Sequence, residues 1–232
     1  MFVTPEQIKD EVTKVVHLIF DTYKDFGITN YRCVLSLRDP ANKEKYHDDD
    51  EMWNTAEGAL RDIMDSLGLE YTEEIGEAAF YGPKLDVNVQ PAVGNEITLS
   101  TCQLDFCLPA KFNLYYIDKD GEKKTPVVLH RAILGSLDRF MAYILEETKG
   151  NLPTWLAPVQ TRVMPVKTDD EALNAYAKEV YDTLMENDIR VELDDRAEKL
   201  GYRMRDGQIQ KVPYLLVIGM NLSLIHISEP TR

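Results

Sequence analysis

The chain has 232 residues, of which 44% are apolar and 28% are charged, values typical of a globular protein with a substantial core. Its formal net charge of −14 argues against a protein that coats nucleic acid without regard to sequence, because such a surface is basic. A local basic face that grips one folded RNA is still compatible with this charge. No apolar run approaches the ~20 residues of a membrane helix, and the first residues lack the basic start and apolar centre of a signal peptide.

The three cysteines, Cys33, Cys102 and Cys107, form neither a disulfide pattern nor a metal-binding pattern. We therefore expect a reducing, cytoplasmic location and no association with a membrane.

The first predicted element is a helix over residues 4–27. Thr4 is its expected N-cap, Pro5 its first helical residue, and Gln7 completes a capping box. Gly27 follows as the expected stop. Residues 31–37 alternate as a strand does, and a second helix is expected from residues 47–53 to about Leu67.

Residues 78–118 alternate with a period of two between turn residues and predict an antiparallel sheet. One expected turn, at Asp120-Gly121, lies just beyond this stretch. The next segment, "LHRAILGSLDRFMAYI", is mostly an apolar helix pattern, so we expect a helix over 129–149 that ends at Gly150. His130 is expected at the junction between strand and helix, at the end of the strand.

Residues 151–158, "NLPTWLAP", contain two prolines and predict a linker between domains. Strand and helix patterns then alternate: strands at 160–166, 189–194 and 212–219, and helices at 170–187 and 196–210. This order predicts a parallel sheet, and the apolar last strand is typical of a strand covered on both faces.

The last residues, 222–232, "LSLIHISEPTR", start where a further helix or a polar loop is expected. A short edge strand is one interpretation. The other is that all eleven residues are the translation of a sequencing-library adapter read in frame, and we take residues up to about 221 as native.

Gly135 and Arg139 are four residues apart, so they would share one face of the expected helix. The missing side chain at Gly135 would leave room beside the arginine for a flat or anionic group. The alternative is an arginine in a salt bridge next to a close-packed glycine. His130, taken alone, is more often a hydrogen-bonded structural residue than a metal ligand, because metal sites need three or four ligands.

Several motifs together resemble one family. "HRAILGSLDRF" is similar to motif 3 of the class II aminoacyl-tRNA synthetases in its threonyl form. Five further segments resemble the same family in the same order, namely "DEMW", "GEAAFYGPKLDV", "STCQLDFCLP", "PTWLAPVQ" and "ELDDRAEKLGYRMRDGQIQKVPYLLVIG". The resemblance covers residues 1–221.

The resemblance implies a fold and an activity. The implied fold is α+β, with a partial class II synthetase antiparallel sheet and flanking helices, followed by a truncated α/β anticodon-binding domain. Its parts would be the second half of the catalytic domain (1–150), the linker (151–158), the anticodon-binding domain (159–221) and the foreign tail (222–232). The implied activity is ATP- and Mg-dependent activation of L-threonine to threonyl-adenylate and its transfer to tRNA(Thr), by a homodimeric parent.

The resemblance also implies roles for individual residues. Arg139 and Lys84 would be catalytic, Arg139 by holding the phosphates of ATP. Tyr81, Thr101 and Gln103 would line the pocket for ATP and amino acid, and His130 would be one of three zinc ligands. The family often has Gln where Thr98 stands, so the role of Thr98 is left open.

In the second domain, a basic strip is expected to contact the tRNA anticodon. It would comprise Arg196, Lys199, Arg203, Arg205 and Lys211. The alternative is a solvated helix whose charges are balanced by acidic neighbours.

The resemblance places the other two zinc ligands, motifs 1 and 2 and an editing domain upstream of Met1. We therefore expect an inactive C-terminal fragment of a threonine–tRNA ligase. The alternative is a free-standing, non-catalytic tRNA-binding paralogue.

Overall fold

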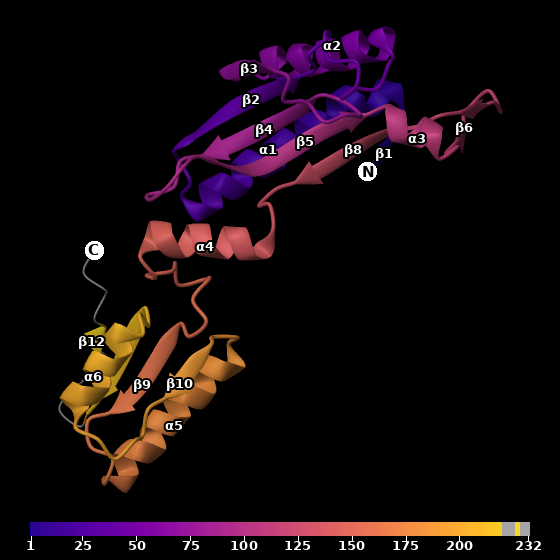
Figure 1. Cartoon of the computed structure of the whole chain (residues 1–232). Coiled ribbons are helices and arrows are strands. Elements are labelled where there is room, and N and C mark those ends of the chain that lie inside the picture. The colour runs from indigo at the N-terminus through magenta and orange to yellow at the C-terminus, as the bar shows by residue number, and fades with distance from the viewer. Residues whose placement is uncertain (220–225, 228–232) are drawn as a thin grey trace. The chain divides into compact units, whose positions relative to one another are not determined.

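The structure is a computed structural model that describes residues 1–219 and 226–227. The chain divides into two compact units, residues 1–141 and 142–232 (Figure 1). Helix α4 (Leu137–Thr148) crosses the boundary between them. None of the described helices is long and apolar enough to cross a bilayer.

The first unit is built on a six-stranded sheet with the order β1-β8-β5-β4-β2-β3. All neighbouring strands are antiparallel except β2 and β3, which are parallel. The strands are β1 (Phe2–Val3), β2 (Tyr31–Leu37), β3 (Tyr71–Ile75), β4 (Lys84–Val89), β5 (Ile97–Asp105) and β8 (Val127–Ala132). The predicted antiparallel sheet is thus confirmed.

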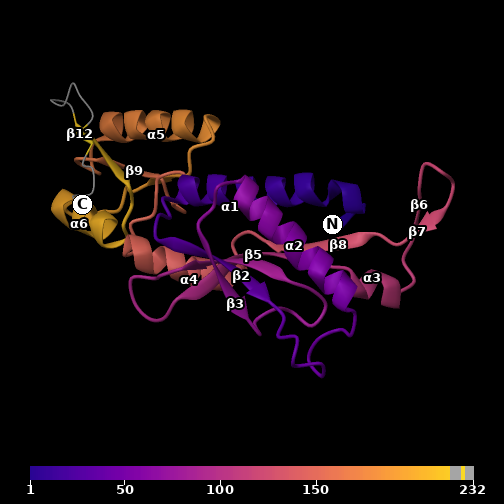
Figure 2. The same ribbon diagram turned by 90° about the horizontal axis from the view of Figure 1, so that it is seen from above.

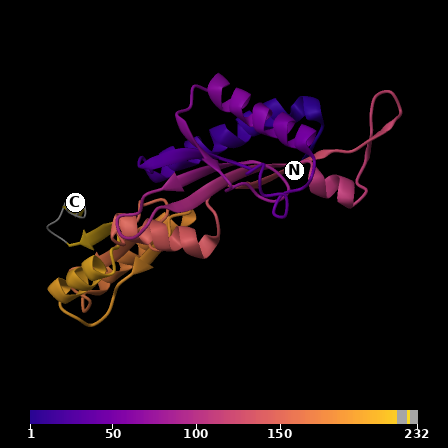
Figure 3. The same cartoon turned by 45° about the horizontal axis from the view of Figure 1, so that its top comes forward.

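Two amphipathic helices, α1 (Ile8–Phe26) and α2 (Asp50–Ser66), cover one face of this sheet (Figures 2 and 3). The predicted capping box precedes α1: the short 3-10 helix η1 (Pro5–Gln7) follows Thr4, whose N–H donates to Gln7 Oε1 at 2.9 Å. Gly27 ends α1 with a φ of 68°. The N-terminus of α2 is capped by Asp49, whose carboxylate accepts from the N–H of Met52. Such caps satisfy backbone groups that a helix leaves unpaired.

The expected helix over 129–149 is wrong in its first part. Residues 129–132 belong to strand β8, and the helix begins only at Leu137. Gly135 lies before the helix with a φ of 64°, so it does not share a helical face with Arg139. A Cβ at Gly135 would also lie 3.3 Å from the Leu99 carbonyl oxygen.

The segment between β5 and β8 also differs from the expected continuous sheet. Residues Cys107–Lys111 form the short helix α3, and the hairpin β6 (Tyr116–Ile117) and β7 (Lys123–Lys124) follows. Gly121 has a φ of 82° in the expected turn. A positive φ is available to glycine at little cost, which explains its place there.

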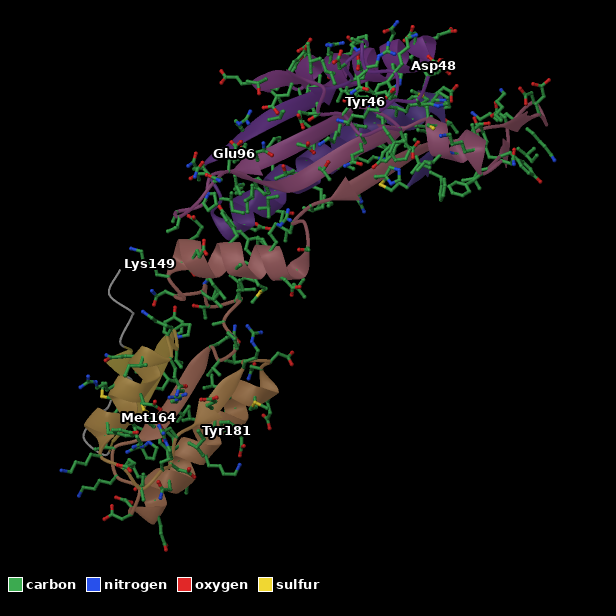
Figure 4. The ribbon with its side chains drawn as sticks, in the orientation of Figure 1. Tyr46, Asp48, Glu96, Lys149, Met164 and Tyr181 are labelled. Carbon is green, nitrogen blue, oxygen red and sulfur yellow. The ribbon has the colours of Figure 1, made fainter. Side chains whose placement is uncertain are left out.

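The second unit has three layers, as the alternating strand and helix patterns predict. Its sheet has the order β10-β9-β11-β12, in which β10 (Val191–Leu193), β9 (Thr161–Pro165) and β11 (Tyr214–Ile218) are parallel. Val163 packs in a cluster with residues of α5 (Glu171–Glu186). Its neighbour Met164, labelled in Figure 4, packs with residues of α6 (Leu200–Ile209). The two helices therefore cover opposite faces of the sheet.

The tail that we predict to be foreign, residues 222–232, lies largely outside the described residues. Within it, only β12 (His226–Ile227) is described, and its backbone pairs antiparallel with β11 at the edge of the sheet.

Candidate functional site

Most of the predicted site residues lie on the face of the first sheet that α1 and α2 do not cover, which we call the open face. On the covered face, the Tyr23 hydroxyl of α1 lies 2.7 Å from Ser100 Oγ of β5. Side chains alternate between the two faces along a strand, so Thr101, Gln103 and Asp105 point to the face opposite α1. Register places Lys84 opposite Gln103 and Asp86 opposite Thr101 on β4, and His130 opposite Gln103 on β8.

A continuous hydrogen-bonded network joins these side chains across β4 and β5. The Tyr81 hydroxyl donates to Gln103 Oε1, and Gln103 Nε2 donates to Thr101 Oγ1 at 3.2 Å. Thr101 Oγ1 then donates to Asp86 Oδ1 at 2.6 Å, and Lys84 Nζ lies 2.8 Å from Asp86 Oδ2. The structure therefore places the side chains of Tyr81, Lys84, Thr101 and Gln103 in one hydrogen-bonded network. Strand residues without a shared role would not need to be connected in this way.

Asp86 is the centre of this network and was missed from the sequence. It is buried, and Ser36 Oγ also donates to its Oδ2, at 3.3 Å. A buried carboxylate needs such donors, because removing an unpaired charge from water is costly. The period of two could have identified it, since Asp86 follows Lys84 by two residues and therefore shares its face.

Tyr81 reaches the network from a segment ahead of β4. The segment is held by a bridge between Ala79 and Gly82, and a Cβ at Gly82 would lie only 1.7 Å from the Leu104 carbonyl oxygen. Glycine is thus required for the close approach of this segment to β5. Burial, with a smaller contribution from the charge of Asp105, raises the pKa of the Tyr81 phenol, so the phenol is a hydrogen-bond donor at neutral pH.

His130 lies beside this network and bonds to a second acid that the sequence analysis did not single out. Its Nε2 is 2.8 Å from Oδ2 of Asp105, a fully buried residue, and its ring centroid is 5.1 Å from that of Tyr81. Like Asp86, Asp105 follows a predicted site residue, Gln103, by two positions along the same strand.

The described residues test whether His130 suits a metal ion. No group of three or more His, Cys, Asp or Glu side chains that could hold a metal is found among them. His130 nevertheless fits one ligand position, because metal-binding histidines usually donate their other ring N–H to a carboxylate or carbonyl. The described residues thus offer one ligand and not a complete site.

Arg139 lies in the first turn of α4 and forms no hydrogen bond with the described residues of the network. Its side chain is exposed, and its backbone N–H is 3.4 Å from Ser136 Oγ. It makes no ion pair with a described residue of the first unit, so the alternative of a salt-bridged arginine gains no support there. Thr98 is also exposed and donates to Asn88 Oδ1 at 2.7 Å.

The expected basic strip of the second unit is only partly at the surface. Lys199, Arg205 and Lys211 are exposed. Arg203, however, is fully buried, and its guanidinium donates to the carbonyls of Glu198, Asp194 and Pro165 at 3.1, 2.7 and 2.7 Å. Arg203 therefore lies inside the unit and not on the strip, because an arginine can satisfy several buried carbonyls at once.

Arg196 is exposed but paired with acids. It donates to both oxygens of Asp194 and to Asp206 Oδ2 at 2.7 Å. The hydrogen bonds from this guanidinium are the main reason why the pKa values of Asp194 and Asp206 are lowered. A cavity of ≈ 640 Å³ next to it is also lined by Arg162 and Tyr181, so the local surface has mixed charge.

Comparison with known proteins identifies the family of the chain. The model of the tRNA synthetase class II core domain (G, H, P, S and T) matches residues 1–148. The chain belongs to the class II tRNA synthetases. A second model, the anticodon binding domain, matches residues 160–222.

Several class II relatives are similar over nearly the whole chain. It is 56% identical to the threonine–tRNA ligase of Staphylococcus carnosus (strain TM300) and 57% identical to that of Geobacillus kaustophilus (strain HTA426), over 94% of its own length in both cases. It spans only about a third of the length of these relatives, 34% and 33%.

Solved structures agree with this placement. The RNA binding domain of threonyl-tRNA synthetase from Cryptosporidium parvum Iowa II matches 98% of the chain and 56% of that structure, with a TM-score of 0.87 and 36% identity. A putative threonyl-tRNA synthetase from Aeropyrum pernix matches 95% of the chain and 52% of that structure, with a TM-score of 0.81 and 29% identity. The predicted class II fold and anticodon-binding domain are confirmed by these matches.

Proposed function

We propose that this chain is part of a threonine–tRNA ligase, which activates L-threonine with ATP and transfers it to tRNA(Thr). The observation that supports this most directly is the bonded set Tyr81, Gln103, Thr101 and Lys84 on the open face of a class II sheet. A binding-only paralogue would have no use for such a set. The 56–57% identity to threonine–tRNA ligases supports threonine as the amino acid.

In this proposal the open face holds ATP and threonine in place. Formation of an adenylate requires attack by a carboxylate on a phosphate, and positioning and charge neutralisation lower its barrier more than proton transfer does. Lys84 supplies a positive charge fixed by Asp86. Arg139 supplies a planar, permanently charged group without an acidic partner in the described part of the first unit, and such a group can pair with phosphate. Mg²⁺ would accompany ATP.

His130 would contribute one ligand to a zinc ion whose other ligands lie outside the described residues. When bound, zinc supplies a Lewis-acid position that takes the amino and hydroxyl groups of threonine and so excludes valine. The side chains of this chain would orient the substrate beside it: Tyr81 packs against the His130 ring, and Gln103 and Thr101 present polar groups along the same face.

The second unit would contact the anticodon of tRNA. Support comes from the anticodon-binding match over residues 160–222 and from the exposed cations Lys199, Arg205 and Lys211. A homodimeric parent and a cytoplasmic location, where tRNA is charged, belong to the same proposal.

A chimera tests the proposal. Residues 1–219 would replace the matching region of the S. carnosus ligase, which would supply the sequences before and after it. We expect threonine-dependent pyrophosphate exchange and charging of tRNA(Thr), with little activity towards valine or serine. A folded chimera that exchanges pyrophosphate with another amino acid, or that binds tRNA without any exchange, would contradict the proposal and favour a different substrate or a non-catalytic paralogue.

A further inference from the structure

The two carboxylate oxygens of Asp105 form hydrogen bonds with different partners. It is the last residue of β5 and is fully buried. Its Oδ1 accepts from the backbone N–H groups of Cys107 at 3.0 Å and Leu108 at 2.8 Å. Its Oδ2 lies 2.8 Å from His130 Nε2. The orientation of this carboxylate is therefore set by the backbone that follows β5.

Only one of the two ring nitrogens of His130 has a hydrogen-bond partner among the described residues. Nε2 faces Asp105, the ring of Tyr81 packs at a centroid distance of 5.1 Å, and 39% of the side chain is exposed. No hydrogen bond to Nδ1 is formed by a residue in the described part of the chain. The nitrogen left without a protein partner is thus the one that lies away from Asp105.

We propose that Asp105 is a positioning residue that keeps the proton of His130 on Nε2 and so leaves the Nδ1 lone pair available to a metal ion. This inference rests on the proposed function, because it gives that function's zinc ligand a defined ligating atom. A carboxylate only accepts hydrogen bonds, so the nitrogen that faces it must bear a proton. A neutral imidazole has a single N–H, so Nδ1 is then unprotonated.

The surroundings of Asp105 make the substitution Asp105→Asn informative. Asparagine has nearly the same shape, but its two ends differ, since one is a C=O acceptor and the other an NH₂ donor. The N–H groups of Cys107 and Leu108 require an acceptor, so the amide oxygen turns towards them. The NH₂ group then faces His130 Nε2, which must accept, and the imidazole proton moves to Nδ1.

The tautomer of His130 can be read directly in this chain by long-range ¹H–¹⁵N correlation spectra of the ¹⁵N-labelled protein, near pH 9, well above the ordinary histidine pKa of ~6.5. His130→Gln assigns the signals, and His17 and His47 serve as internal references. We expect an unprotonated Nδ1 in the wild type and the inverted tautomer in Asp105→Asn. The matched control is Asp86→Asn, which changes a buried acid on the same face that does not contact His130, and it should leave the tautomer as in the wild type.

Two results would overturn the inference: a protonated Nδ1 in the wild type, or a folded Asp105→Asn variant with the wild-type tautomer. The wild-type spectrum by itself shows whether Nδ1 of His130 is protonated, so it tests the inference even if the variant fails to fold. In the chimeric ligase, chelator titration should show zinc affinity lowered roughly 10–100-fold by Asp105→Asn but not by Asp86→Asn, and an unchanged affinity would also overturn it. A wild-type chimera that binds no zinc would instead contradict the proposed function, while the tautomer would still decide the role of Asp105.

Discussion

Two arginines of α6, only two residues apart, have opposite surroundings. Arg203 is fully buried against three backbone carbonyls, whereas Arg205 is exposed. We expect Arg203→Met to lower the free energy of unfolding of the second unit by about 2–4 kcal/mol, because it leaves buried carbonyls without donors. Urea unfolding followed through amide signals of β9 and β11 measures this.

Arg205→Met is the matched control for that change. It should alter stability by less than about 0.5 kcal/mol, as surface substitutions usually do, but should weaken binding of tRNA if the strip contacts RNA. Equal stability losses from both variants would show that the buried carbonyl contacts of Arg203 contribute little.

A second prediction for a single residue concerns the role of Arg139 in adenylate formation. In the chimeric ligase, Arg139→Ala should reduce the rate of adenylate formation by ~10²–10³-fold, equivalent to about 2.7–4 kcal/mol, because a fixed charge on a developing phosphate is lost. Binding of tRNA should be unchanged. Pyrophosphate exchange and a filter-binding assay report the two quantities.

Arg131→Ala is the control for Arg139. Arg131 is also exposed, but it alternates with His130 on β8 and so points to the opposite face. A loss below tenfold for Arg139→Ala, or an equal loss for both variants, would argue for a structural role of Arg139.

Single residues show what the sequence could and could not predict. Lys84, Thr101 and Gln103 were proposed as site residues through family resemblance, and their strands were predicted through alternation. The period of two places Asp86 and Asp105 on the same face as Lys84 and Gln103, but the two acids were missed because alternation does not show which partners they bind on neighbouring strands. The burial of Arg203 was missed for a similar reason, since the carbonyls it contacts come from the end of β9 and from the loop that joins β10 to α6.

At the scale of elements, the segment that presents Tyr81 depends on one glycine. We expect Gly82→Ala to destabilise the first unit by roughly 3 kcal/mol or more, because the new methyl group would overlap the backbone of Leu104 and backbone cannot move aside easily. Thermal and urea unfolding measure the loss.

Gly58→Ala is the control within the same unit. Gly58 lies inside α2, and a Cβ there meets no atom within 4 Å. It should stabilise the unit by up to about 1 kcal/mol, since alanine favours helices over glycine. A mild effect of Gly82→Ala would indicate that the segment can shift away from β5.

Elements defined by local signals were predicted well, and elements defined by distant partners were not. The caps at Thr4 and Gly27 correctly bounded the first helix. Residues 129–132 were assigned to a helix because their apolar spacing continues that of α4, but they pair with residues 101–104 of β5. Long-range pairing overrode the local pattern there, as tertiary context often does.

At the scale of the whole molecule, the chain spans about a third of the ligases it resembles, and its described residues include only one candidate zinc ligand. We expect the purified 232-residue chain to show no threonine-dependent pyrophosphate exchange above background, because one candidate ligand among the described residues does not make the proposed zinc site. Exchange above background would mean that residues of this chain alone complete the site. The chimera measured alongside serves as the positive control.

The network from Tyr81 through Gln103 and Thr101 to Asp86 and Lys84 has a consequence for engineering. Directly bonded residues typically show coupling energies of about 0.5–3 kcal/mol, so the effects of their substitutions do not add. A single change at Gln103 would leave partners on both sides unsatisfied, and it would be scored as harmful even where a compensating change at Thr101 exists. Libraries intended to alter amino-acid selectivity should therefore vary Tyr81, Thr101 and Gln103 together, since one-position scans would discard the productive combinations at their first step.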